Sequence, residues 1–292
     1  MYFGLSKATA TPDVLDKPTP HPGGRKSWLL PAILLLCFSA QSLWFIATQS
    51  LTFDEPAHII AGVDAWQQHR FERWNDHPPL GRLWLTLLLS RARTSFAVEP
   101  LPAGSLVTAV QPAPEWIAWH TRPMNTLLGV ALGLILWVAT RRLFSAGAAN
   151  VALALFAFTP SLIAHFSVAT TDGIGTLFIF LTAFQLIVWR HNPGVWQTVA
   201  MGLGLGGLLL AKFYGPPFVL LALGIMLISS PDGGFAYPRR GNWSSAATAL
   251  VIAIGTLWAG YFFHVSRLQI ANRQVIATFP NRPVKVWATK SK

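Results

Sequence analysis

Long apolar runs without a charged side chain constrain this chain more than any other feature. The first extends from Trp28 to about Thr48, and six more follow at about 124–140, 148–168, 173–189, 196–211, 214–229 and 246–263. A transmembrane helix needs ~20 consecutive, predominantly apolar residues. The composition agrees, since 52% of the residues are hydrophobic and only 11% are charged. We therefore predict an all-α polytopic membrane protein with about seven transmembrane helices.

Basic residues give the predicted spans an orientation. Arg25 and Lys26 precede the first run, and basic pairs follow later runs: Arg141-Arg142, Arg190-His191 and Arg239-Arg240. Because Lys and Arg concentrate on the cytoplasmic side, this spacing places the N-terminus inside and residues 49–122 outside. If residues 83–90 crossed the membrane instead, all three pairs would lie outside. The net charge of +11 is scattered around apolar runs rather than gathered in one stripe, which argues against a nucleic-acid partner.

The domain organisation follows from these runs. Residues 1–27 are rich in Thr, Pro and Gly and are expected to form a disordered cytoplasmic tail. Residues 28–265 form the transmembrane domain, and residues 266–292 are a polar, basic C-terminal tail. The single cysteine, Cys37, lies inside the first run, so no internal disulfide can form.

The first outer loop is predicted to contain surface helices. Thr52 and Glu55 have the spacing of a capping box, which predicts a helix at about 54–70. The run Leu83–Leu89 is too short to span. It is expected to lie on the membrane surface, with Trp84 and its flanking arginines at headgroup level.

Prolines and glycines mark other features of the chain. Residues 97–115 carry several prolines and are expected to be irregular. Pro160, Pro216 and Pro217 are expected to kink or end helices near the outer face. Four glycines between 202 and 207 lie in an apolar run, which indicates close helix packing rather than a phosphate-binding loop.

Polar side chains concentrate in the outer loop. Charged groups are costly near hydrocarbon, so acids gathered at a membrane edge indicate a functional site. With the predicted orientation, seven polar side chains from distant parts of the chain come out near the outer side: Asp54, Asp76, His77, Arg122, His165, Asp172 and Lys212.

The loop candidates each have a structural and a functional interpretation. Asp54 and Glu55 are adjacent at a helix start, so they point in different directions. One would cap the helix while the other favours its dipole, or one would act as a base or metal ligand. His58 lies one turn further on and faces either acid, or it is an interfacial histidine. The two prolines after His77 fix the backbone there, which either positions the His77 side chain for function or forms an ordinary proline turn.

The candidates beyond the loop are similarly open. Asp172 either caps the fourth span or aims its carboxylate at the pocket that Asp54 faces. Lys212 and Arg122 either reach lipid headgroups or contact a phosphate.

The order of these motifs resembles that of the membrane-embedded GT-C glycosyltransferases. An Asp-Glu pair follows the first span, and His-Pro-Pro-Leu lies later in the first outer loop. An Arg precedes the second span, Arg-Arg-Leu-Phe follows it, and Thr-Asp opens the fourth. The pattern is most similar to glycosyltransferase family 39, the relatives of protein O-mannosyltransferases and of aminoarabinose transferases acting on lipid A. The resemblance covers roughly residues 28–265.

This resemblance implies an inverting transferase of hexose or pentose units. The donor would be a polyprenyl-phosphate sugar, and the acceptor a lipid, glycan or protein. Asp54 matches the acid that serves as base, and Glu55 the second acid of the catalytic pair. The implied substrate contacts are His58, Asp76, His77, Arg122, Asp172 and Lys212.

The resemblance also implies a setting. A divalent metal, Mg²⁺ or Mn²⁺, would be held by Asp54, His77 and Asp172, and no other cofactor is implied. The enzyme would be integral to a bacterial inner membrane, in contact with membrane lipids, with its active site facing the periplasm or exterior.

The length of the chain leaves alternatives open. Relatives of this type usually carry more spans and often a soluble outer domain, so the chain is expected to be the core of a longer enzyme. A truncated, non-catalytic membrane protein is one alternative. A transporter of lipid-linked substrates is another, but transporters keep ionisable groups deep within spans, and here the acids gather in a loop.

Overall fold

A computed structural model describes residues 28–71, 77–101, 104–228, 240–263, 267–271, 274–279 and 282–288. The predicted tail at 1–27 and the candidate Asp76 lie outside these residues.

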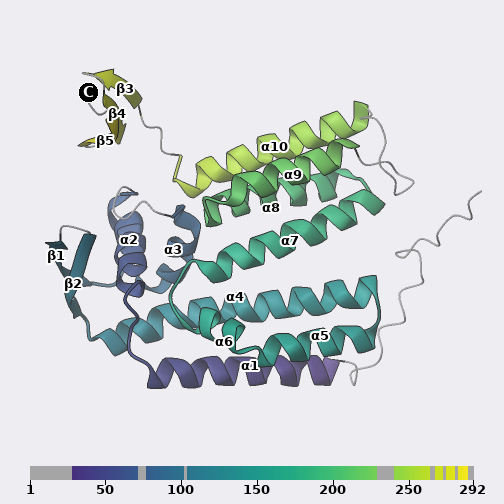
Figure 1. The fold of residues 1–292 in the computed structure, drawn as a ribbon, viewed down its shortest axis with the longest axis horizontal. Coiled ribbons are helices and arrows are strands. Elements are labelled where there is room, and N and C mark those ends of the chain that lie inside the picture. The colour runs from purple at the N-terminus through teal and green to yellow at the C-terminus, as the bar shows by residue number, and fades with distance from the viewer. Residues whose placement is uncertain are drawn as a thin grey trace, which may run out of the picture.

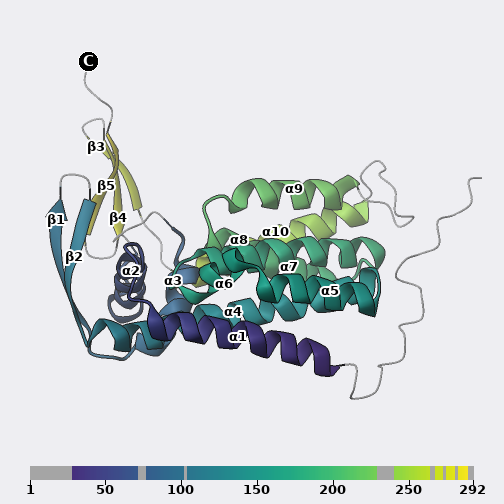
Figure 2. The same cartoon turned by 60° about the horizontal axis from the view of Figure 1, so that its bottom comes forward.

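Helices make up most of the described chain, in agreement with the predicted all-α class. They are α1 (Leu29–Thr48), α2 (Glu55–Gln68), α3 (Pro79–Leu85), α4 (Pro114–Leu143), α5 (Ala146–Phe158), α6 (Pro160–Ser167), α7 (Asp172–His191), α8 (Val195–Ala211), α9 (Gly215–Ile228) and α10 (Arg240–Gly260). The long helices run side by side along the long axis of the molecule (Figures 1 and 2). At one end of this bundle lie α2, α3 and the strands (Figure 1).

Four of these helices are long and apolar enough to cross a membrane: α1, α4, α7 and Asn242–Gly260 within α10. The α5–α6 pair makes a fifth candidate, bent by 61°. This bend falls where Pro160 begins α6, as predicted for that proline. The apolar helices α8 and α9 are shorter, with 17 and 14 residues. All seven predicted segments are therefore helical, while a count of seven crossings stays a prediction.

Close packing of small residues joins the helices of the bundle. A Cβ at Gly202 would lie 2.6 Å from Cβ of Ile252, and one at Gly206 would lie 2.5 Å from Cβ of Thr256. Since both partners belong to α10, the glycines of α8 allow two backbones to approach closely. This confirms the packing interpretation of the glycine run.

The outer loop differs from its prediction at α3. The helix expected at 54–70 is present as α2, but α3 does not lie on the surface. Arg82, Leu83 and Leu85 are buried, and the indole of Trp84 donates to the carbonyl of Met124 at 2.8 Å. The expectation of arginines at headgroup level was wrong for Arg82, because α3 packs inward against the bundle helices.

The strands form two small antiparallel sheets that were not predicted. β1 (Ser95–Leu101) pairs with β2 (Gly104–Gln111), so the expectation of irregular structure at 97–115 was wrong. The second sheet has the order β3-β4-β5 and consists of β3 (Arg267–Ala271), β4 (Gln274–Phe279) and β5 (Arg282–Ala288). The polar C-terminal segment is therefore largely extended.

An aromatic cluster ties the end of α10 to the end of α2. The ring of Phe262 lies 5.6 Å from that of Trp66, 5.3 Å from that of His69 and 5.5 Å from that of Phe71. Phe262 has a positive φ of 55°, which costs a non-glycine residue about 1–2 kcal/mol. The ring contacts offset this cost and bring the last helix to the outer loop.

Candidate active site

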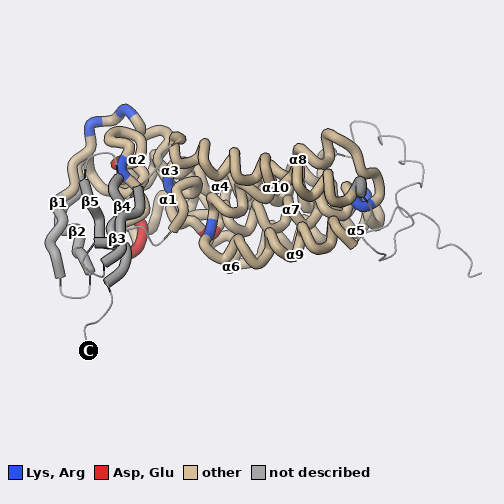
Figure 3. The backbone as a smooth tube through the Cα atoms, turned by 90° about the horizontal axis from the view of Figure 1, so that it is seen from above, with Lys and Arg blue, Asp and Glu red and all other residues tan. Residues whose placement is uncertain are grey.

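The acidic segments of the described chain gather at one end of the bundle, together with several basic ones (Figure 3). In Figure 3 the acidic segments lie toward the end that carries α2 and α3, whereas the far end near α5 shows basic segments. Arg141 and Arg142 end α4, and Arg190 lies in the last turn of α7. The basic ends of α4 and α7 thus lie opposite the end that holds the acids, as the predicted orientation requires.

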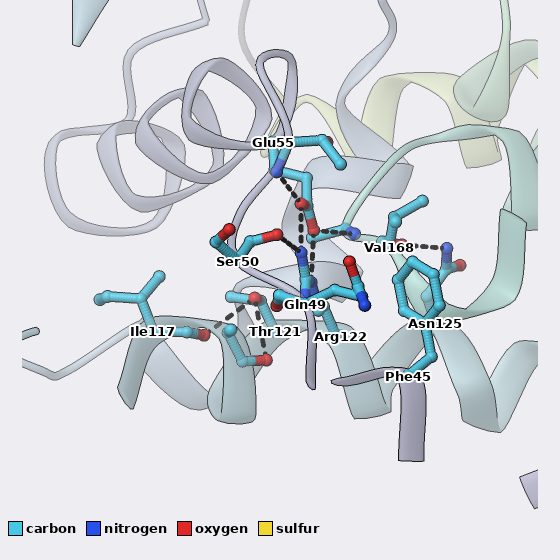
Figure 4. A network of polar contacts seen from close by, with 12 residues as sticks. Phe45, Gln49, Ser50, Glu55, Ile117, Thr121, Arg122, Asn125 and Val168 are labelled. Carbon is cyan, nitrogen blue, oxygen red and sulfur yellow. Dashed lines mark hydrogen bonds and ion pairs between the residues drawn. The ribbon is translucent and has the colours of Figure 1, made fainter. Parts of the chain in front are cut away.

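A buried ion pair lies at the acidic end, between Glu55 on α2 and Arg122 on α4 (Figure 4). Arg122 Nε donates to Glu55 Oε1 at 2.8 Å, and Arg122 Nη2 donates to Glu55 Oε2 at 2.7 Å. Both side chains are fully buried. This bidentate geometry is the strong form of an arginine–carboxylate contact.

Backbone groups complete the pair. The carboxylate of Glu55 accepts from the N–H groups of Thr52 and Ala169, each at 2.6 Å. The guanidinium of Arg122 donates to the carbonyls of Gln49 at 2.6 Å and Ser50 at 2.7 Å. The pair therefore fastens together the end of α1, the start of α2, α4 and the segment between α6 and α7.

These contacts explain the acidity of Glu55. Burial opposes its ionised form, but hydrogen bonds from Arg122, Ala169 and Thr52, together with the charge of Arg122, outweigh burial and hold the pKa of Glu55 below its usual value. The bond from the Thr52 N–H is one half of the predicted capping box. The geometry thus favours a structural role for Glu55 and Arg122. The expected catalytic role of Glu55 and the expected substrate contact of Arg122 stay predictions.

A second polar group surrounds Asp172, the first residue of α7. Lys212 Nζ lies 2.8 Å from Asp172 Oδ1, and His165 Nδ1 lies 3.6 Å from Oδ2. The side chain of Lys212 is nearly buried, while those of Asp172 and His165 are about half exposed. Of the two interpretations of Asp172, the cap does not agree with the structure, because Thr171 holds the N-cap position and Asp172 makes an ion pair. Lys212 likewise points to Asp172 rather than to lipid headgroups.

Two histidines extend this group toward the outer loop. His77 lies near enough to Asp172 to interact with it electrostatically. The ring of His58 lies 5.4 Å from that of His77. Of the residues predicted to converge, His77, His165, Asp172 and Lys212 therefore lie together. His58 lies beside His77, and its expected substrate contact stays a prediction.

Asp54 lies beside the buried pair but in a different environment. It occupies the N-cap position of α2 without capping it, and its side chain is exposed. Within the described part of the chain, its carboxylate makes no hydrogen bond or ion pair. Glu55 next to it bonds to Ala169, three residues before Asp172. Asp54 and Asp172 therefore belong to the same end of the molecule.

The described side chains do not fit a divalent metal at Asp54, His77 and Asp172. Among these residues no group of three or more His, Cys, Asp or Glu side chains is placed to hold a metal ion. The ammonium of Lys212, 2.8 Å from Asp172, would also repel a second cation there.

Sequence reasoning missed one residue of this region, Asn125, and misplaced another, Arg82. Asn125 is buried on α4, one turn beyond Arg122, and bonds to the segment before Asp172. Arg82 on α3 is also buried. A polar residue spaced three positions from Arg122 was the available signal for Asn125, since such residues share a helix face.

Comparisons with known proteins identify the fold and the family of this chain. Among solved structures, the chain is similar to the S. cerevisiae protein O-mannosyltransferase Pmt1-Pmt2 complex bound to the sugar donor, with a TM-score of 0.56 and 17% identity. The similarity covers 82% of this chain and 33% of that one. This chain thus spans about a third of the matched structure and shares its fold.

The comparison with curated proteins found no match. A family model described as dolichyl-phosphate-mannose-protein mannosyltransferase matches residues 112–258, a segment that includes Arg122, Asp172 and Lys212. Since this match spans half of the sequence, the chain belongs to the dolichyl-phosphate-mannose-protein mannosyltransferase family.

Proposed function

We propose that this chain is the membrane-embedded core of a glycosyltransferase. It takes a hexose or pentose from a polyprenyl-phosphate donor and transfers it to a lipid, glycan or protein acceptor. The observation that carries the proposal is the placement of an exposed acid, Asp54, at the same end of the bundle as the Asp172–Lys212 pair. Family membership supports the same reaction class.

Asp54 is the proposed base. An acceptor hydroxyl must lose its proton as it attacks the anomeric carbon, which calls for a carboxylate within hydrogen-bond reach. Asp54 is exposed and free of partners among the described residues, whereas Glu55 is held by four hydrogen bonds. Asp54 is therefore the member of the acidic pair that can accept a proton.

Lys212 is the proposed partner of the leaving phosphate. As the bond from the anomeric carbon to phosphate breaks, the lipid phosphate gains a negative charge that a nearby cation stabilises. The acceptor oxygen forms its new bond on the opposite face of the sugar, so the configuration inverts. His165 and His77 border the same group and are suited to contact sugar hydroxyls.

The membrane face on which the proposed active site lies follows from the orientation of the bundle. The acidic end faces away from the basic ends of α4 and α7, which the charge rule places in the cytoplasm. We place the site on the extracytoplasmic face of a bacterial inner membrane, where the donor's lipid tail lies between the helices and its sugar reaches the outer loop.

Sugar transfer in membranes tests the proposal. Membranes that contain the chain are supplied with a panel of radiolabelled polyprenyl-phosphate sugars, with and without EDTA. Asp54→Asn is expected to lower transfer by about 10²–10⁴-fold, the usual contribution of a general base. EDTA is expected to leave transfer unchanged, because Lys212 rather than a metal faces the phosphate.

Glu115→Gln is the matched control, since Glu115 is another exposed acid in the first turn of a helix. Its transfer rate should equal that of the wild type at equal protein level. Undiminished transfer by Asp54→Asn would contradict the assignment of the base. Loss of transfer in EDTA would show that transfer requires a divalent metal.

A further inference from the structure

Two members of the charged group around Lys212 lie at the two ends of the segment that joins α6 to α7. His165 lies in the last turn of α6, and Asp172 begins α7. Residues 168–171, the α6–α7 connector, therefore set the position of both side chains. The carbonyls at the end of α6 have no partners within their own helix, so their bonds must come from elsewhere.

Asn125 bonds to one of these carbonyls and to two carbonyls of the connector. Its amide nitrogen lies 2.9 Å from the carbonyl oxygen of His165, 2.7 Å from that of Val168 and 3.4 Å from that of Thr170. The side chain of Asn125 is fully buried. The hydroxyl of Thr126 donates to the carbonyl of Phe166 at 3.0 Å. Two adjacent residues of α4 thus hold the end of α6 and the connector.

The connector is also held from its other side. Its Ala169 N–H donates to Glu55 at 2.6 Å. A Cβ at Gly81 of α3 would lie 2.8 Å from Cγ2 of Thr171, so α3 packs directly against the connector. With its carbonyls bound by α4, an N–H bound by α2 and a side chain against α3, the connector has little freedom to shift.

We propose that Asn125 is a positioning residue of the active site, which holds the α6–α7 connector so that Asp172 meets Lys212. The inference rests on the proposed function for its catalytic consequence. Asn125 touches neither reactant; it acts through the connector. A misplacement of about 1 Å in a supporting group can cost about 10²-fold in rate.

Two measurements test this role. The first is the acylation rate of Lys212 by N-hydroxysuccinimidyl acetate in the purified, detergent-solubilised full chain, read by peptide mass spectrometry. Asn125→Ala should raise this rate about fivefold or more, because the amine leaves a nearly buried ion pair. The second is the kinetics of sugar transfer. There kcat should fall about tenfold or more with a donor KM within about twofold of the wild type, as expected when a contact made chiefly in the transition state is lost.

Two further variants separate positioning from general loss of structure. Thr126→Val keeps the side-chain shape and removes one bond to the same segment, so it should change both readouts in the same direction by a smaller factor. Thr182→Val is the control, because the Thr182 hydroxyl is buried in the bundle without a hydrogen bond among the described residues. It should leave both readouts unchanged.

The outcomes are distinct for the two proposals. If Lys212 acylation and kcat both stay at wild-type values in Asn125→Ala and Thr126→Val, the positioning role is wrong. It is equally wrong if acylation rises only in proportion to a fall in melting temperature. If the wild type transfers no sugar from any donor, the proposed function fails, while the acylation rates still decide whether Asn125 holds Asp172 against Lys212.

Discussion

At the scale of single residues, Asp54 and Glu55 are neighbours with opposite surroundings. Glu55 is buried and fully bonded, while Asp54 is exposed beside it. Successive residues at a helix start point in different directions, so one can fasten the loop while the other faces a reactant. The buried acid thereby fixes the position of its exposed neighbour.

The depressed pKa of Glu55 predicts how stability depends on pH. A carboxyl group whose pKa is lower in the folded state stabilises the fold above its unfolded value of about 4.5 and loses that contribution as pH falls through the folded value. Glu55→Gln leaves Arg122 buried without its counter-charge, which should cost about 3–5 kcal/mol at pH 7.

Thermal unfolding in detergent between pH 7 and pH 3 checks this expectation. The difference in melting temperature between the wild type and Glu55→Gln should shrink as the pH falls below about 4.5. Glu115→Gln, at an exposed position, should follow the wild-type curve. If the difference in melting temperature between wild type and Glu55→Gln stays constant across the range, Glu55 does not stabilise the fold through its ion pair.

Sequence could identify these residues but not their partners. The spacing of Thr52 and Glu55 predicts a cap, and one of its two bonds is present. The contact of Glu55 with Arg122 joins residues 67 apart, and nothing in local spacing predicts which arginine meets which acid. The sequence leaves Asp172 open between a cap and a site carboxylate for the same reason, because its partner Lys212 follows it only after the whole of α7 and α8.

At the scale of elements, the apolar runs predicted the helices of the bundle but not the structure of the outer loop. The β1–β2 hairpin was missed because prolines dominated the interpretation, although Val98, Val107 and Val110 favour strands. The helix α3 was assigned to the surface because its apolar run is short. Its burial depends on packing against the bundle, which a local pattern does not contain.

The α8–α10 crossing gives a prediction for an element. Gly206→Ala would place a methyl group 2.5 Å from Cβ of Thr256 and 2.8 Å from the carbonyl of Ala253, so the helices must separate. Such overpacking costs about 1–3 kcal/mol. The melting temperature of the solubilised protein should fall accordingly.

Gly224→Ala in α9 is the matched control, because nothing lies within 4 Å of its added Cβ. This variant should melt with the wild type or slightly above it, since alanine favours helix more than glycine does. Equal melting temperatures for Gly206→Ala and Gly224→Ala would contradict close packing at the crossing.

At the scale of the whole molecule, the charge pattern predicts a topology. Seven crossings would place positions 54, 172 and 263 on the outer face and position 142 on the inner face. Single-cysteine variants in a Cys37→Ala background, treated with a membrane-impermeant maleimide in intact cells, would report these faces. Labelling of 54 and 172 from opposite sides would mean that α5 and α6 do not complete a crossing.

The buried Glu55 also has a consequence for how the protein is made. Its carboxylate bonds to Arg122 and Ala169, which follow it by 67 and 114 residues. During synthesis the loop after α1 must therefore leave the ribosome with Glu55 still hydrated. Glu55 can become buried only after α6 has been synthesised. Assembly of this end of the molecule is then a late event in translation, which depends on the synthesis of later helices rather than on the loop itself.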